Sequence, residues 1–208
     1  MRVTVTVLLA LLLPWPGPPA RAEEAGAGGA RQALERHWRD LVAEKGLDAL
    51  VTPLLPPGVA LPPAGDGLLQ PVIGLQGPLR GFARVTCPAN DEARVELLDL
   101  YGGSVGLATF EDCPVLASPL DLSGGGAVPA LLAVYRGEAV AGLVVPTPAG
   151  GLVVPLDLPG LTVTAAADAD GDGFAETITL STGEKSPAIT CPLGDAPALI
   201  ACADRLQS

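Results

Sequence analysis

From residue 80 onward, short apolar runs alternate with turn residues, and this pattern most narrows the choice of fold. Runs rich in Val, Leu and Thr that are bounded by Gly, Pro, Asp and Asn are typical of strands. The candidate strands are residues 80–87, 93–100, 105–111, 129–135, 139–145, 151–156, 161–166 and 175–181. The pattern predicts a mainly β fold, as a small antiparallel sandwich or as stacked β-sheets. Because only 3% of the residues are aromatic, the core has to be built from Leu and Val.

The first 22 residues have the features of a signal peptide. A basic start, Met1-Arg2, precedes an apolar run over residues 3–13, which is too short to cross a bilayer core of about 30 Å. Ala20-Arg21-Ala22 fits the small-x-small pattern of a cleavage site. We therefore expect residues 1–22 to be removed and the mature chain to be exported, to the periplasm or outside the cell.

Two segments are expected between this leader and the β region. Apolar residues recur at helical spacing in residues 31–45, and Gly46 follows at a position typical of a helix end. Seven prolines between residues 52 and 79 disfavour a helix or a central strand. The predicted organisation is a helical segment at 23–51 with one N-terminal α-helix, a linker or wrapping loop at 52–79, and a β-rich domain at 80–208.

The apolar stretch at 127–145 is interrupted by Arg136-Gly137-Glu138. Charged residues in the middle of an apolar stretch are costly in a bilayer, so a transmembrane helix is excluded there. The three residues instead predict a hairpin turn, and we expect no membrane span in the mature chain.

Four cysteines predict disulfide bonds in an exported chain. Of the three possible pairings, we favour Cys87–Cys113 with Cys191–Cys202, because each bond closes a short loop. Each bond is expected to contribute about 3 kcal/mol by restricting the unfolded chain. A zinc site is the competing interpretation. It is disfavoured because there is no C-x-x-C pair and because the one histidine, His37, is distant in sequence.

The mature chain is strongly acidic. Removal of Arg2 and Arg21 with the leader leaves ten basic against 23 acidic residues, a net charge of −13. This charge repels phosphate backbones and anionic membrane surfaces, which excludes nucleic acid as a favoured partner. It attracts cations, and it also helps to keep the protein soluble.

One loop carries recognisable chemistry. Residues 168–176 read DADGDGFAE, with acids at loop positions 1, 3, 5 and 9 and glycine at position 6. Calcium requires six to eight oxygens, and alternate residues of a tightly curled loop direct their oxygens to one centre. The glycine permits the reversal after which the carbonyl of residue 174 turns inward. Position 12 is Thr179 and the flanks alternate like strands, so we expect a strand–loop–strand site and not an EF-hand.

This loop resembles the D-x-D-G-D-G-x-x-[DE] loop of the FG-GAP and VCBS repeat families. In those families the loop joins two antiparallel strands of propeller blades or related β modules. The resemblance covers residues 168–182, and it implies calcium ligation by the side chains of Asp168, Asp170, Asp172 and Glu176 and by the Phe174 carbonyl. A metal-free hairpin is the alternative, since Asp-Gly is itself a turn signal. Mutual repulsion of three unneutralised aspartates within about 5 Å argues against it.

A degenerate copy of the loop is visible near residues 121–136. Asp121-Leu122-Ser123-Gly124-Gly125-Gly126 aligns with residues 168–173 at an offset of 47 residues, a spacing typical of propeller-blade repeats. The acids at positions 3, 5 and 9 are absent, so we expect no metal there. A chance Gly-rich turn explains the match equally well, and two units cannot close a propeller.

No catalytic constellation is recognisable in the sequence. There is no nucleophile elbow, no P-loop and no H-E-x-x-H motif. We therefore expect an exported β protein with a structural calcium loop, acting as an interaction or structural module toward a protein or carbohydrate partner. Two alternatives remain open: a secreted hydrolase that uses carboxylates, and a metal-free envelope protein with a vestigial loop.

Overall fold

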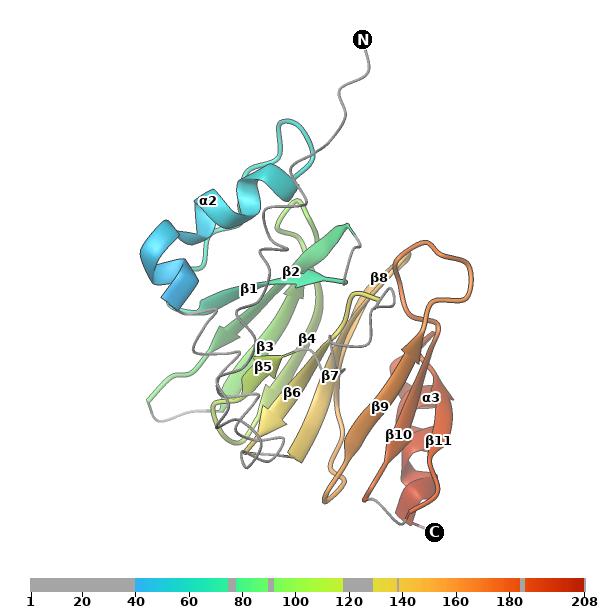
Figure 1. The fold of residues 1–208 in the computed structure, drawn as a ribbon. Helices are drawn as coiled ribbons and strands as arrows, with labels where there is room; N and C mark the ends of the chain where they lie inside the picture. The colour runs from blue at the N-terminus through green and yellow to red at the C-terminus, as the bar shows by residue number, and fades with distance from the viewer. Residues whose placement is uncertain are drawn as a thin grey trace, which may run out of the picture.

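A computed structural model describes residues 40–74, 78–89, 92–117, 129–137, 139–183 and 186–207. These residues form eleven strands in three antiparallel sheets (Figure 1). The first sheet has the order β1-β2-β3-β4, with strands at Leu68–Ile73, Leu79–Thr86, Ala93–Leu98 and Ser104–Phe110. The second has the order β5-β6-β7-β8, with strands at Val115–Ala117, Leu132–Arg136, Ala139–Thr147 and Gly150–Pro155. The third has the order β11-β10-β9, with strands at Ile189–Pro192, Thr177–Ser181 and Thr162–Ala167.

Short helices flank the sheets at both ends of the described chain. The helix α2 spans Leu47–Val51 and continues into the 3-10 turn η3 at Thr52–Leu54. The helix α3 spans Ala196–Ala203 and continues into η5 at Asp204–Gln207. The start of α3 is fixed by Asp195, whose side chain accepts a hydrogen bond from the Ala198 N–H. No helix in the described part of the chain has the length and apolar character needed to cross a membrane.

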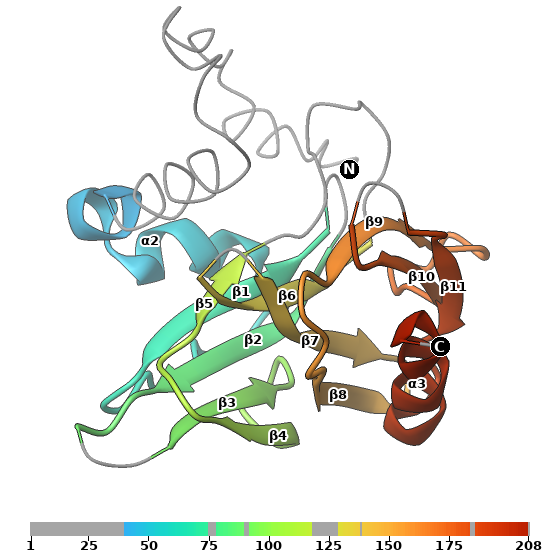
Figure 2. The ribbon, with the colours of Figure 1, turned by 90° about the horizontal axis from the view of Figure 1, so that it is seen from below.

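The second sheet is the central layer of the molecule. It lies between the first sheet, with α2 on the outer side, and the third sheet with α3 (Figures 1 and 2). One hydrophobic cluster joins the central sheet to the first sheet, and another joins it to the third sheet and α3. A third cluster packs α2 and the following segment on the outer face of the first sheet.

The strand β6 shows how the sequence produces this layering. Leu132 and Val134 belong to the cluster shared with the first sheet, whereas Ala133 and Tyr135 belong to the cluster shared with the third sheet. Successive side chains of a strand point to opposite faces, so a strand that is buried on both faces has to be apolar at every position. This requirement explains the unbroken apolar run of β6, and the same holds for most of β7.

The mainly β, antiparallel fold predicted from the sequence is confirmed. Each of the eight candidate segments contains a strand, from β2 near residue 80 to β10 at Thr177–Ser181. The hairpin predicted at 136–138 is also present, since Arg136 of β6 pairs with Ala139 of β7. These agreements follow from the turn residues, which mark strand ends through local conformation alone.

The prediction that residues 52–79 form only a linker or wrapping loop is wrong for their second half. Residues 68–73 form β1, so the first sheet begins before residue 80. Pro71 lies in this strand opposite Phe82. It is tolerated because β1 is an edge strand, in which an N–H is not required on the outer side. The strands β5 and β11 and the helix α3 were also not predicted.

The predicted signal peptide, His37 and most of the helix predicted at 31–45 lie outside the described residues. Residues 40–45 are helical. They end at Gly46, where φ is 78° and where the N–H donates to the Val42 carbonyl at 2.8 Å. A left-handed glycine that closes the last turn in this way is a common helix end.

Removal of a buried side chain from the central sheet tests this arrangement. Leu143 of β7 is completely buried, so Leu143→Ala is expected to lower the free energy of unfolding by about 2–5 kcal/mol. The matched control is Leu107→Ala in β4, because Leu107 is 60% exposed and its loss should change stability by less than about 0.5 kcal/mol. Urea unfolding measures both variants, and equal effects would contradict a core at Leu143.

Candidate metal centre

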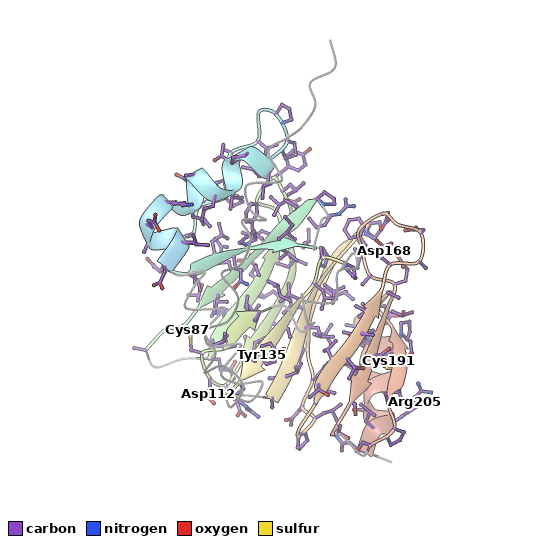
Figure 3. The ribbon with its side chains drawn as sticks, viewed as in Figure 1. Cys87, Asp112, Tyr135, Asp168, Cys191 and Arg205 are labelled. Atoms are coloured by element: carbon purple, nitrogen blue, oxygen red, sulfur yellow. A yellow bond between two sulfur atoms is a disulfide. The ribbon has the colours of Figure 1, made fainter. Side chains whose placement is uncertain are left out.

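The loop 168–176 connects two strands that are paired up to its ends. Ala167, the last residue of β9, is the register partner of Thr177, the first residue of β10. The Glu176 N–H also donates to the Ala167 carbonyl at 2.9 Å. The strand–loop–strand setting predicted from the flanks is therefore confirmed. Asp168 lies at one end of the third sheet, and Arg205 lies toward the other end (Figure 3).

Aspartate side chains hold the loop in a curled conformation. Asp168 accepts hydrogen bonds through Oδ1 from the Gly171 N–H (2.7 Å) and through Oδ2 from the Gly173 N–H (2.8 Å). Asp170 Oδ1 accepts from the Asp172 N–H at 3.1 Å. Each carboxylate oxygen has two lone pairs, so an oxygen bound to an amide can still face a cation. The hydrogen bonds shape the loop without using up its capacity to bind a metal.

The other end of the loop is closed in the same way. Asp172 Oδ1 accepts from the Phe174 N–H at 2.8 Å, and Glu176 Oε2 accepts from the Ala169 N–H. The Glu176 contact joins the last acidic residue to the start of the loop. As a result, the side chain of Glu176 lies next to the aspartates.

Two glycines allow the chain to reverse. Gly171 has φ of 79° and Gly173 has φ of 89°, a left-handed conformation that costs other residues about 1–2 kcal/mol. The glycine predicted at loop position 6, Gly173, has the conformation that a sharp reversal requires.

The four predicted side-chain ligands converge. One oxygen from each of Asp168, Asp170, Asp172 and Glu176 lies within 4.8 Å of every other. Oxygens on opposite sides of a calcium ion, each at about 2.3–2.6 Å, are separated by roughly 5 Å. The cluster therefore has the dimensions of a calcium coordination shell. Its hard, anionic oxygens are the ligands that calcium and magnesium prefer.

Two parts of the sequence hypothesis stay predictions. Ligation by the Phe174 carbonyl is one of them. The other is the degenerate copy of the loop, because residues 121–128 lie outside the described residues.

Sequence reasoning missed the contacts that the loop makes with other sheets. The guanidinium carbon of Arg80, in β2, lies 4.2 Å from the centroid of the Phe174 ring. The Gly173 carbonyl accepts a hydrogen bond from the Ala130 N–H at 3.1 Å, just before β6. No local pattern indicates either contact, because both join segments that are far apart in sequence.

A second polar site lies on the outer face of the first sheet. Arg84 of β2 and Glu96 of β3 are register partners, and the Arg84 Nε and Nη2 atoms both donate to Glu96 Oε2. The pair lines a groove together with Ala64, Gly65, Asp66, Thr86, Arg94 and Leu107. Burial raises the pKa of Glu96. Hydrogen bonds from Ser104 and Arg84 and the charge of Arg84 outweigh burial, so that the net change is a lowered pKa.

The predicted cysteine pairs are at bonding distance. Cys87 and Cys113 form one disulfide, and Cys191 and Cys202 form the other. The second bond joins α3 to β11, and both of its cysteines belong to the cluster shared by the central and third sheets. No cysteine is free in the described structure, which leaves none for the competing zinc site.

Comparisons with known proteins do not assign this chain to a family. Neither family models, nor curated proteins, nor solved structures gave a match.

The lowered pKa of Glu96 predicts a pH-dependent contribution to stability. A carboxyl whose pKa is lower in the folded state stabilises the fold above its unfolded pKa, and this contribution is lost as the pH falls through the folded value. The difference in unfolding free energy between wild type and Glu96→Gln should therefore shrink as the pH falls below the ordinary glutamate value of 4.5. Urea unfolding over a pH series measures this difference.

The control is Glu111→Gln. Glu111 is paired with Arg136 at 3.3 Å, but its side chain is 85% exposed, and exposed ion pairs contribute little. The same pH dependence in both variants would contradict a special role for the Arg84–Glu96 pair.

Proposed function

We propose that this chain is an exported β protein whose loop 168–176 binds one calcium ion structurally, and that it serves as an interaction or structural module. The observation that carries the proposal is the convergence of four carboxylates on one point. Four like charges at this separation repel one another. A divalent cation at their centre would convert this repulsion into attraction and would fix the loop.

The donor set supports calcium over softer metals. The loop offers oxygen ligands and contains no histidine or cysteine, which disfavours zinc and copper. Phe174 would add a backbone carbonyl to the four carboxylates, giving the mixed oxygen shell that calcium accepts. The likeness of residues 168–182 to FG-GAP and VCBS loops belongs to the same proposal.

Export is supported by the leader-like residues 1–22 and by the two disulfide pairs, because disulfides persist in oxidising compartments. The periplasm and the extracellular space both fit these features. We expect the partner to be a protein or a carbohydrate. The acidic mature chain disfavours nucleic acid.

The acids that line the groove on the first sheet do not favour the hydrolase alternative. A general acid at neutral pH needs a raised pKa, whereas the pKa of Glu96 is lowered and its carboxylate is held by Arg84. Carboxylate hydrolysis needs one acid that donates a proton and a second that acts as base or nucleophile. Asp66 is the second acid of the groove, and Glu96 is not suited to be its proton donor.

Calcium-dependent stability tests the proposal. With free calcium at 100 times its dissociation constant, the wild type should gain about 2.7 kcal/mol over the chelated protein, a rise in melting temperature of roughly 5–10 °C. Asp172→Asn should abolish most of this gain at the same calcium concentration. Its amide oxygen can still accept from the Phe174 N–H, so the variant removes the charge and retains the loop hydrogen bond. Thermal melting followed by circular dichroism measures both.

Asp157→Asn is the matched control. Asp157 is exposed between β8 and β9, and its substitution changes the net charge by the same amount without touching the loop. This variant should keep the full calcium effect. If the wild type melts at the same temperature with calcium and with chelator, the metal-free alternative with a vestigial loop takes the place of the proposal.

A further inference from the structure

The loop 168–176 contacts both of the other sheets at one place, its Gly173–Phe174 segment. Arg80 reaches this segment from the first sheet, and the Ala130 N–H reaches it from the segment just before β6 of the central sheet. A Cβ atom built on Gly173 would lie only 2.8 Å from Arg80 Nη2, so the guanidinium rests directly on the loop backbone. We name Arg80, Ala130, Gly173 and Phe174 the loop latch.

Packing holds Arg80 in the latch. Its guanidinium lies over the Phe174 ring in a cation–π contact. Within the described part of the chain it forms no ion pair, and its buried Nε has no hydrogen-bond partner there. A buried donor without a partner is costly. The guanidinium instead contacts Gly173 and Phe174 of the loop, so its position depends on the loop conformation.

We propose that calcium binding in the loop locks the third sheet onto the other two through the latch, with Arg80 as the positioning residue. This inference rests on the proposed calcium site. The acids at 168 and 172 bind the amides of Gly173 and Phe174, so an ion that fixes those acids also fixes the latch. Coupling between two equilibria is reciprocal. Damage to the latch therefore weakens calcium binding, and calcium stabilises the latch.

Two glycines of the same loop provide a matched test. Gly171→Ala and Gly173→Ala introduce similar left-handed strain, since φ is 79° and 89°. A Cβ at Gly171 meets nothing within 4 Å, whereas one at Gly173 meets Arg80. Calcium affinity measured by titration calorimetry should fall roughly tenfold further in Gly173→Ala than in Gly171→Ala, in line with coupling between residues in contact.

The same pair is then measured in an Arg80→Ala background. There the clash is absent, so the two glycine variants should have equal calcium affinities. The comparison also cancels any effect of the Arg80 charge alone, because that charge is missing from both members. If Gly173→Ala stays weaker than Gly171→Ala by the same factor without Arg80, Arg80 is not the positioning residue.

Hydrogen exchange of the Ala130 amide reports on the latch directly. Calcium at 100 times its dissociation constant should slow this exchange, by up to about 100-fold if opening of the latch releases the ion. The Gly103 amide, bound to Asp99 in the β3–β4 turn, should be unaffected. Calcium binding without slower Ala130 exchange would overturn the latch and leave the calcium site intact. No calcium binding by the wild type would overturn the proposed function itself.

Discussion

Burial of the central sheet on both faces is the constraint on which the rest of the structure depends. The strands β6 and β7 leave no face for solvent, so a layer has to cover each side. The first sheet supplies one cover and the third sheet with α3 supplies the other (Figure 2). With so few aromatic residues, each layer buries modest Leu, Val and Ala side chains. Contact between three layers compensates for the small area buried by each residue.

The two outer layers are stabilised by cross-links in addition to hydrophobic packing. The third sheet has three strands, which is the smallest number expected to give a sheet stability of its own. The Cys191–Cys202 bond and α3 support this sheet at β11, while the loop latch joins the β9–β10 loop to β2 and to the segment just before β6. The Cys87–Cys113 bond links the end of the first sheet to the segment that leads into the central one. The Cys87–Cys113 bond and the latch therefore lie where layers meet, whereas the Cys191–Cys202 bond strengthens the third layer itself.

Local signals in the sequence were sufficient for most of the fold and for the acidic side chains of the site. Turn residues located eight strands, and alternate spacing of the acids predicted their convergence, because both depend on neighbours in sequence. Pro71 was misread because its acceptability depends on β1 being an edge strand, which is a property of the assembled sheet.

The strands β5 and β11 are too short to give a pattern. The helix α3 was missed, although Asp195 and Pro197 at its start are residues typical of a helix N-terminus. Arg80 gave no signal, since its role arises only when β2 meets the loop.

The electrostatics of the loop explain why a metal and a latch would belong together. Backbone amides donate to the carboxylates of the loop and reduce the repulsion among them, but amide dipoles carry only partial charges. A divalent ion at the centre of the cluster would offset two of the four negative charges, and it would hold the loop in the conformation that Arg80 and Ala130 contact. Because the latch joins the third sheet to the other two layers, a cation bound at this edge would act on the contact between layers as well as on the loop itself.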